Sequence, residues 1–192
     1  MAETTTLLDV ASLDRVRDRL RDRDWRDVTV EEMGQAIGMS RMTLHRRGIS
    51  KDVLLGQLAG LLEAEYREAI LPALVSTAPA PERLRAALAA LCQVNERYLG
   101  LLEALGRASA FVFHEEGEGP VLTKVTFTDA LRRILEDGIA AGTLRAENPT
   151  EMATLLFNAT GWTYRHMRTG HRWAPDHVRE LLVALLLDGV TA

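Results

Sequence analysis

A cluster of basic side chains between residues 41 and 51 is the most chemically distinctive feature of the sequence. This segment holds Arg41, Arg46, Arg47 and Lys51 and no acidic residue, although the 192-residue chain carries a formal net charge of −4. Cations concentrated on a short segment of an acidic protein are suited to binding a polyanion such as a chain of phosphates. We therefore expect this segment to contact phosphates.

Two short helices joined by a turn are predicted to position these side chains. Thr29 and Glu32 have the spacing of a capping box, so a first helix begins near Thr29, and Gly38 can end it in a left-handed conformation. Ser40 can cap a second helix whose inward residue is Leu44. At about 100° per residue, the outward face of that helix holds Met42, Thr43, His45 and Arg46, with Arg41 and Arg47 on its flanks. This arrangement is typical of a helix-turn-helix, whose second helix enters the DNA major groove.

The same segment resembles the TetR family of bacterial transcriptional regulators. The matching residues are Thr29, Val30, Ala36, Gly38, Met39, Ser40, Thr43, Leu44, Ser50, Lys51 and Leu54. The resemblance implies an all-α protein with a helix-turn-helix DNA-binding domain at residues 1–57 and a helical ligand-binding and dimerisation domain at residues 58–192. The sequence departs from the family at His45, where tyrosine is usual, at Gly48, where phenylalanine is usual, and at Met42, where the residue is often small.

The expected partner is double-stranded DNA carrying a pseudopalindromic operator, bound by a homodimer that represses transcription and responds to an unidentified small-molecule effector. Met42, Thr43 and His45 would contact base edges or adjacent phosphates. Phosphates would be contacted by Arg41, Arg46, Arg47 and Lys51 and by the helix start at Thr29. The alternative is a helical dimer of the same fold that binds a ligand or protein partner without operator binding, as the departures at His45 and Gly48 suggest.

The composition is that of a globular helical protein, with 47% hydrophobic, 26% charged and 5% aromatic residues. Residues 1–57 hold ten basic and ten acidic residues, so the acidic excess lies entirely in residues 58–192. The single cysteine, Cys92, excludes an internal disulfide and is expected to be a buried, inert thiol. No apolar run is long enough to cross a bilayer, so we expect a cytoplasmic protein with no membrane partner.

Hydrophobic spacing and cap residues predict the remaining helices. They are expected at residues 7–24, from Ser50 to an end at Pro72, from Pro81 past residue 99, at 101–113, at 121–141, from the cap at Asn148 to about residue 168, and at 175–188. Residues 76–81 are predicted to be a linker and residues 114–120 an exposed loop. The class is all-α.

The last two predicted helices are apolar over more of their circumference than is needed to bury one face in the chain's own core. This pattern favours a four-helix interface between two copies of the chain. The residues expected at this interface are Met152, Leu155, Leu156, Ala159, Val178, Leu181, Leu182 and Leu185. A monomer with a thick core is the alternative.

The resemblance also implies a small-molecule pocket in the second domain. Its candidate aromatic residues are Tyr98, Phe111, Phe127, Phe157 and Trp162. Aromatic side chains at helical spacing pack in protein cores by default, so core packing remains the alternative for each of them.

An enzyme is not expected. Two histidine-containing groups, at residues 114–116 and at His166 and His171, are the nearest approach to a catalytic or metal site. The five-residue separation across Gly170 does not place both imidazoles on one helical face, and the acidic loop is expected to face solvent. No nucleophile motif, glycine-rich phosphate loop or cysteine cluster accompanies them, so we expect no catalytic residues, metal or cofactor.

Overall fold

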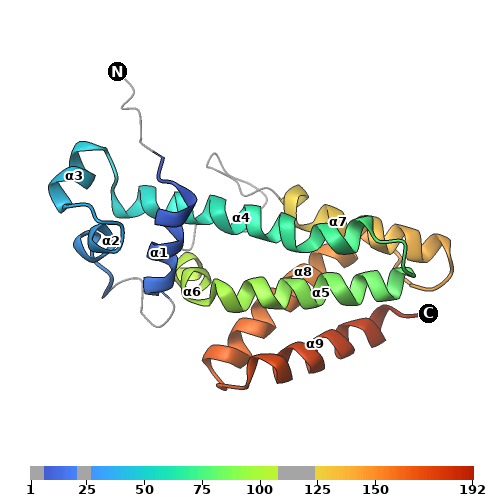
Figure 1. Cartoon of the computed structure of the whole chain (residues 1–192). Helices are drawn as coiled ribbons and strands as arrows, with labels where there is room; N and C mark the ends of the chain where they lie inside the picture. Colours follow the sequence, from blue (N-terminus) through green and yellow to red (C-terminus); the bar gives the residue numbers. More distant parts are fainter. Residues whose placement is uncertain (1–6, 21–26, 108–123) are drawn as a thin grey trace. The chain divides into compact units, whose positions relative to one another are not determined.

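α-Helices make up the regular structure in the computed structural model of the chain (Figure 1), which describes residues 7–20, 27–107 and 124–192. The helices are α1 (Val10–Leu20), α2 (Val30–Ala36), α3 (Arg41–Arg46), α4 (Lys51–Val75), α5 (Ala80–Arg97), α6 (Leu99–Arg107), α7 (Lys124–Ala140), α8 (Pro149–Thr169) and α9 (Pro175–Val190). An isolated antiparallel bridge between Leu144 and Thr191 is the one β pairing within these ranges. The all-α class is confirmed, whereas the loop predicted at 114–120 and the end of the helix predicted at 101–113 lie outside the described residues.

The chain divides into two compact units, and one helix contributes to both. The first unit comprises residues 1–62 and 98–122, and the second comprises residues 63–97 and 123–192. The division falls within α4, so the first three turns of that helix belong to one unit and the remainder to the other. The functional domains at 1–57 and 58–192 remain a prediction.

In the first unit, α1 packs against α2 and α6. The unit's buried apolar residues include Leu13, Val16, Leu20, Val28, Met33, Leu44, Ile49, Leu54, Leu58, Leu62, Leu101 and Leu102. Tyr98 is fully buried, and the guanidinium of Arg17 lies 5.2 Å from the centre of its ring. This contact between a cation and an aromatic face joins the middle of α1 to the residue that precedes α6.

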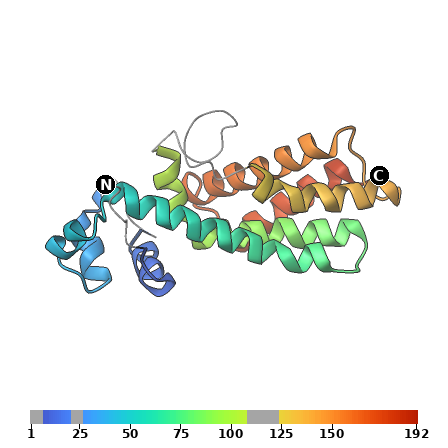
Figure 2. The same cartoon turned by 90° about the horizontal axis from the view of Figure 1, so that it is seen from above.

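In the second unit, α5 packs against α7, α8 and α9, and α8 packs against α7 and α9. The second half of α4 and α5 run side by side, joined by the short connection at residues 76–79 (Figure 2). Arg97 of α5 forms an ion pair with Glu65 of α4, with Nη1 2.5 Å from Oε2. The rings of Tyr66 and Phe157 meet edge to face at 5.7 Å and connect α4 to α8.

The predicted end of α4 at Pro72 is wrong, because the helix continues to Val75 with Pro72 inside it. Proline removes one backbone donor and disfavours a continued helix. Here the following turn is held by Arg83 of α5, whose Nε donates to the carbonyl of Ala73 at 3.0 Å and whose Nη2 donates to the carbonyl of Leu74 at 2.9 Å. A side chain about ten residues further along the chain thus satisfies carbonyls that a helix end leaves free.

The turn between α8 and α9 is tied to α5 through Arg168. Its Nε and Nη2 form a two-pronged ion pair with the carboxylate of Glu96, at 2.7 and 2.8 Å, and its Nη1 donates to the carbonyl of Trp173. The hydroxyl of Tyr164 donates to the same carboxylate at 3.0 Å. These hydrogen bonds to Glu96 raise the pKa of Arg168, and burial together with the nearby Glu96 charge raises the pKa of Tyr164.

Candidate nucleic-acid interface and ligand groove

The first helix of the predicted helix-turn-helix begins with a complete capping box. The Thr29 hydroxyl accepts from the backbone N–H of Glu32 at 3.2 Å, and the Glu32 carboxylate accepts from the backbone N–H of Thr29 at 2.8 Å. The same carboxylate lies 3.0 Å from the Thr29 hydroxyl. Thr29 is exposed, but both its hydroxyl and its N–H already have partners within the helix start.

The turn between α2 and α3 depends on two glycines. Gly38 has a φ of +72°, the left-handed conformation that suits glycine after a helix. The N–H of Met39 then returns to the carbonyl of Gly34 at 2.8 Å. Gly34 itself is buried, and a Cβ at this position would lie 2.5 Å from the Met39 carbonyl oxygen. Gly34 was not identified from the sequence, although an isolated glycine inside a helical pattern can mark a packing constraint.

Ser40 caps α3 and also engages a residue of the proposed DNA-reading face. Its hydroxyl accepts from the backbone N–H of Thr43 at 3.1 Å and lies 2.9 Å from the Thr43 hydroxyl. Leu44 is fully buried and anchors α3 to the unit's core. The cap and the anchor predicted from sequence are confirmed, and together they fix which side of this short helix faces outward.

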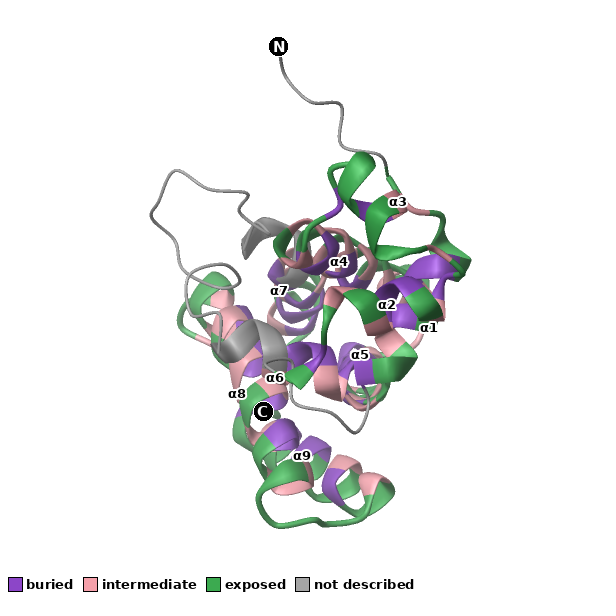
Figure 3. Cartoon of the chain, turned by 90° about the vertical axis from the view of Figure 1, so that its left-hand side faces the viewer, coloured by how far each residue is buried: buried purple, intermediate pink, exposed green. Residues whose placement is uncertain are grey.

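Most of the predicted DNA-contacting residues on α3 are exposed, as the prevailing green of this helix in Figure 3 shows. Met42 is 80% exposed, and Thr43 and Lys51 are half-buried. The other exposed members of the set are Arg41, His45, Arg46 and Arg47. The structure therefore brings the predicted cations together on one short helix and the residues that follow it.

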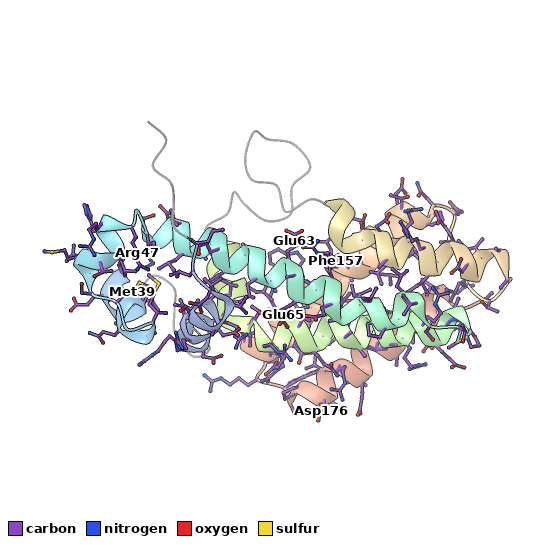
Figure 4. All side chains as sticks on the ribbon, turned by 45° about the horizontal axis from the view of Figure 1, so that its top comes forward. Met39, Arg47, Glu63, Glu65, Phe157 and Asp176 are labelled. Carbon is purple, nitrogen blue, oxygen red and sulfur yellow. The ribbon has the colours of Figure 1, made fainter. Side chains whose placement is uncertain are left out.

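The end of α3 repeats the geometry of the end of α2. Gly48 has a φ of +66°, and the N–H of Ile49 returns to the carbonyl of Leu44 at 3.0 Å. Ile49 is only 2% exposed, so an apolar side chain occupies the junction between α3 and α4, a role that sequence reasoning did not assign to it. Arg47, at the end of α3, donates to the sulfur of Met39, which precedes the helix, at 3.7 Å, and Figure 4 labels the two side chains close together. Ser50 then caps α4 through the N–H of Val53 at 3.2 Å.

An open groove lies between α4 and α7 within the second unit. Its volume is about 700 Å³. The residues that line it are Ala64, Arg67, Glu68, Ile70, Leu71, Leu74, Asp129, Ala130 and Arg133. Asp129 pairs with Arg132 and Arg133, and the hydrogen bond from Arg132 is the main cause of the lowered pKa of Asp129. An apolar floor with charged edges at this volume is of a size that holds a small organic molecule.

The structure does not bring the five aromatic pocket candidates together at this groove. Tyr98 belongs to the first unit, Phe157 packs on Tyr66, and Trp162 is 58% exposed with the Arg165 guanidinium 4.1 Å from its ring centre. Phe111 and the side chain of Phe127 lie outside the described residues. Figure 4 labels Phe157 among the side chains of the second unit. The groove lining was missed because it consists of aliphatic and charged residues, which carry no distinctive sequence signal.

The predicted dimer residues divide into an outward and an inward set. Leu155, Leu181 and Leu185 are 62%, 51% and 69% exposed. Met152 and Ala159 are half-buried. The inward set is Leu156, Val178 and Leu182, which are buried within the chain and hold α8 and α9 to the unit. Leu155, Ala159 and Trp162 follow a spacing of four and three residues, so they form one stripe along α8.

The two histidines of the α8–α9 region lie closer together than their spacing suggested. The rings of His166 and His171 are 5.2 Å apart, because the helix ends after Thr169 and the chain folds back. Within the described residues, no group of three or more histidine, cysteine or acidic side chains is arranged to hold a metal ion. Cys92 is buried, as predicted, and burial raises the pKa of its thiol to about 12. None of the helices described is both long enough and apolar enough to span a membrane.

Comparison with solved structures shows the same fold throughout most of the chain. A transcriptional regulator of the TetR/AcrR family from Thermobifida fusca YX-ER1 is 21% identical, with a TM-score of 0.66 over 92% of this chain and 95% of that one. AibR, in complex with isovaleryl coenzyme A and operator DNA, is 19% identical, with a TM-score of 0.66 over 92% and 96%. A regulatory protein of the TetR family from Rhodococcus RHA1 is 17% identical, with a TM-score of 0.68 over 94% and 97%. No curated protein sequence matches this chain significantly.

Residues 77–190, more than half of the chain, match the family model described as the tetracyclin repressor-like C-terminal domain. This match lies outside the helix-turn-helix segment on which the sequence resemblance was based, so the two identifications rest on different residues. The chain belongs to the TetR family of bacterial transcriptional regulators.

Proposed function

We propose that the protein is a ligand-responsive transcriptional repressor that binds a pseudopalindromic DNA operator as a homodimer. The observation that carries this proposal is the basic surface of α3, where Arg41, Arg46 and Arg47 are exposed on a helix fixed by the Ser40 cap and the Leu44 anchor. A rigidly mounted short helix with exposed cations fits the DNA major groove. AibR, a protein of the same fold, is bound to operator DNA and isovaleryl coenzyme A in its solved structure.

In this proposal the cations and the base-reading residues have separate roles. Arg41, Arg46, Arg47 and Lys51 contact phosphates and set the position of α3, while Met42, Thr43 and His45 face the base edges. Thr29, at the start of α2, lies beside the phosphates in this proposal. Its hydroxyl and N–H keep their hydrogen bonds to Glu32.

The effector is proposed to bind in the second unit. The α4–α7 groove described above has a volume suited to a small molecule. Because α4 belongs to both units, a ligand that contacts its second half can shift the equilibrium between dimer states with different separations of the recognition helices. Repression is relieved if the effector favours the state with lower affinity for the operator.

The test is a salt-dependent binding assay of the purified protein against a pool of genomic DNA fragments. We expect one pseudopalindromic sequence to be enriched and its affinity to fall steeply as salt rises. Arg46→Glu should reduce the affinity at least tenfold and flatten the salt dependence. Arg85→Glu, an equal charge change at an exposed position on α5, should leave both unchanged.

The alternative, a dimer that has lost operator binding, predicts a different result. All fragments would then bind with the same weak affinity, and Arg46→Glu would not change the selection. Gly48 is one of the departures that suggested this alternative. The left-handed conformation of residue 48 at the end of α3 explains why glycine occurs there.

A further inference from the structure

Met42 is unusual among the exposed apolar side chains of the described structure. It is 80% exposed, more than any other large hydrophobic residue described. Leu155, Leu181 and Leu185 expose apolar surface on two helices that pack together, α8 and α9, whereas Met42 has the exposed Arg41, His45 and Arg46 as its neighbours on α3. A single apolar side chain surrounded by cations is too small a patch for a protein interface.

Two polar side chains close to Met42 in the sequence already have partners. The Thr43 hydroxyl is 2.9 Å from that of Ser40, and Arg47 donates to the sulfur of Met39. Met42, His45 and Arg46 are three and four residues apart and therefore form one row along the outward face of α3. That row presents an apolar group, an imidazole and a cation in succession.

The major-groove edge of a base pair carries one apolar group, the C5-methyl of thymine. Resting on the DNA-binding function proposed above, we propose that Met42 packs against a thymine C5-methyl and so specifies an A·T pair at one position in each operator half-site. The flexible thioether side chain of methionine can cover the methyl without a fixed hydrogen-bond geometry. The inference concerns sequence specificity, whereas the surrounding cations contribute affinity for any sequence.

The experiment replaces each thymine of the selected half-site, one at a time, by deoxyuridine, which removes only the methyl group. Burying one methyl corresponds to about fourfold in affinity, so a symmetric substitution in both half-sites should weaken binding by about 15-fold. This loss should occur at one thymine per half-site with the full-length protein. With Met42→Ala and Met42→Gln, thymine and uridine at that position should bind equally well.

Two further variants control for indirect effects. Met42→Leu keeps an apolar side chain and should retain a preference for thymine over uridine. Val10→Ala, which truncates an exposed side chain on α1, should retain the full wild-type preference. The high exposure of Met42 means that its replacement leaves the fold intact, which thermal unfolding of each variant verifies.

The outcomes separate this inference from the function on which it rests. If a sequence is selected but no thymine methyl affects its affinity, or if Met42→Ala keeps the wild-type preference, the inference is overturned and the repressor function stands. If no sequence is selected, the proposed function fails and the inference fails with it.

Discussion

Glycines in the helix-turn-helix act at the residue scale through the space and backbone angles that they allow. Gly38 and Gly48 have positive φ angles, which let α2 and α3 end by the same pattern of returning hydrogen bonds. Gly34 acts differently, because its missing side chain lets the Met39 carbonyl approach the middle of α2. The position of α3 therefore depends on the absence of a Cβ at Gly34 in the preceding helix, α2.

Gly34→Ala should destabilise the protein and weaken DNA binding. The added Cβ would lie 2.5 Å from the Met39 oxygen and 3.0 Å from Leu44 Cδ1, so the turn must move. Overpacking of this kind costs about 1–3 kcal/mol in the free energy of unfolding, measurable by urea denaturation. Gly56→Ala is the matched control, since a Cβ there meets nothing within 4 Å on helix α4 and should stabilise the protein by about 0.5–1 kcal/mol. Equal stability of the two variants would contradict this account.

The residues of the candidate DNA surface could be identified from sequence because each depends on nearby neighbours. The Thr29–Glu32 capping box and the Ser40–Thr43 cap each join residues three apart, and the inward Leu44 follows Ser40 by four. This is the range over which helix geometry acts. The α4–α7 groove could not be identified in this way. Arg67 and Arg133, which are more than sixty residues apart in the sequence, both line it because α4 and α7 lie together in the folded unit.

At the scale of elements, long-range side-chain contacts decide where helices end and how they turn. α4 passes the predicted stop at Pro72 because Arg83 holds its last carbonyls, an effect that local propensity cannot reveal. The α8–α9 turn is likewise fixed from outside by Glu96 of α5, through Arg168. The helix starts at Asn148 and Pro175 were predicted, since their signals lie within the element itself.

Arg168→Lys should destabilise the second unit more than loss of a surface ion pair would. Lysine keeps the charge but cannot form the two-pronged contact with Glu96 and also donate to the Trp173 carbonyl. We expect a loss of about 1–3 kcal/mol in the free energy of unfolding by urea. Arg179→Lys is the control, because its pairing with the exposed Asp176 at 2.9 Å is worth at most about 1 kcal/mol. If both variants lose the same amount, Arg168 does not secure the turn.

At the scale of the whole molecule, two exposed surfaces differ in their chemistry. The cations of α3 suit a polyanion, whereas Leu155, Leu181 and Leu185 expose apolar surface on α8 and α9. The inward partners of those leucines, Leu156 and Leu182, are buried within the chain, so each helix is apolar on two sides. A helix with this pattern is stabilised when a second copy covers its outward side.

Leu185→Glu should convert the proposed dimer to a monomer, because a carboxylate buried at the interface without a partner opposes association. Analytical ultracentrifugation should show the mass of one chain, and operator affinity should fall at least 100-fold because the two half-sites are no longer bound by one linked pair of recognition helices. The monomer should still bind a single half-site, with the affinity that one recognition helix provides.

Val75→Glu provides the matched control, since Val75 is 68% exposed at the end of α4, lies outside α8 and α9, and does not line the α4–α7 groove. It should remain dimeric and keep its operator affinity. If Leu185→Glu is also dimeric, the pair of copies must associate through another surface. If it is monomeric but binds the full operator as tightly as the wild type does, dimerisation through α9 does not serve DNA binding.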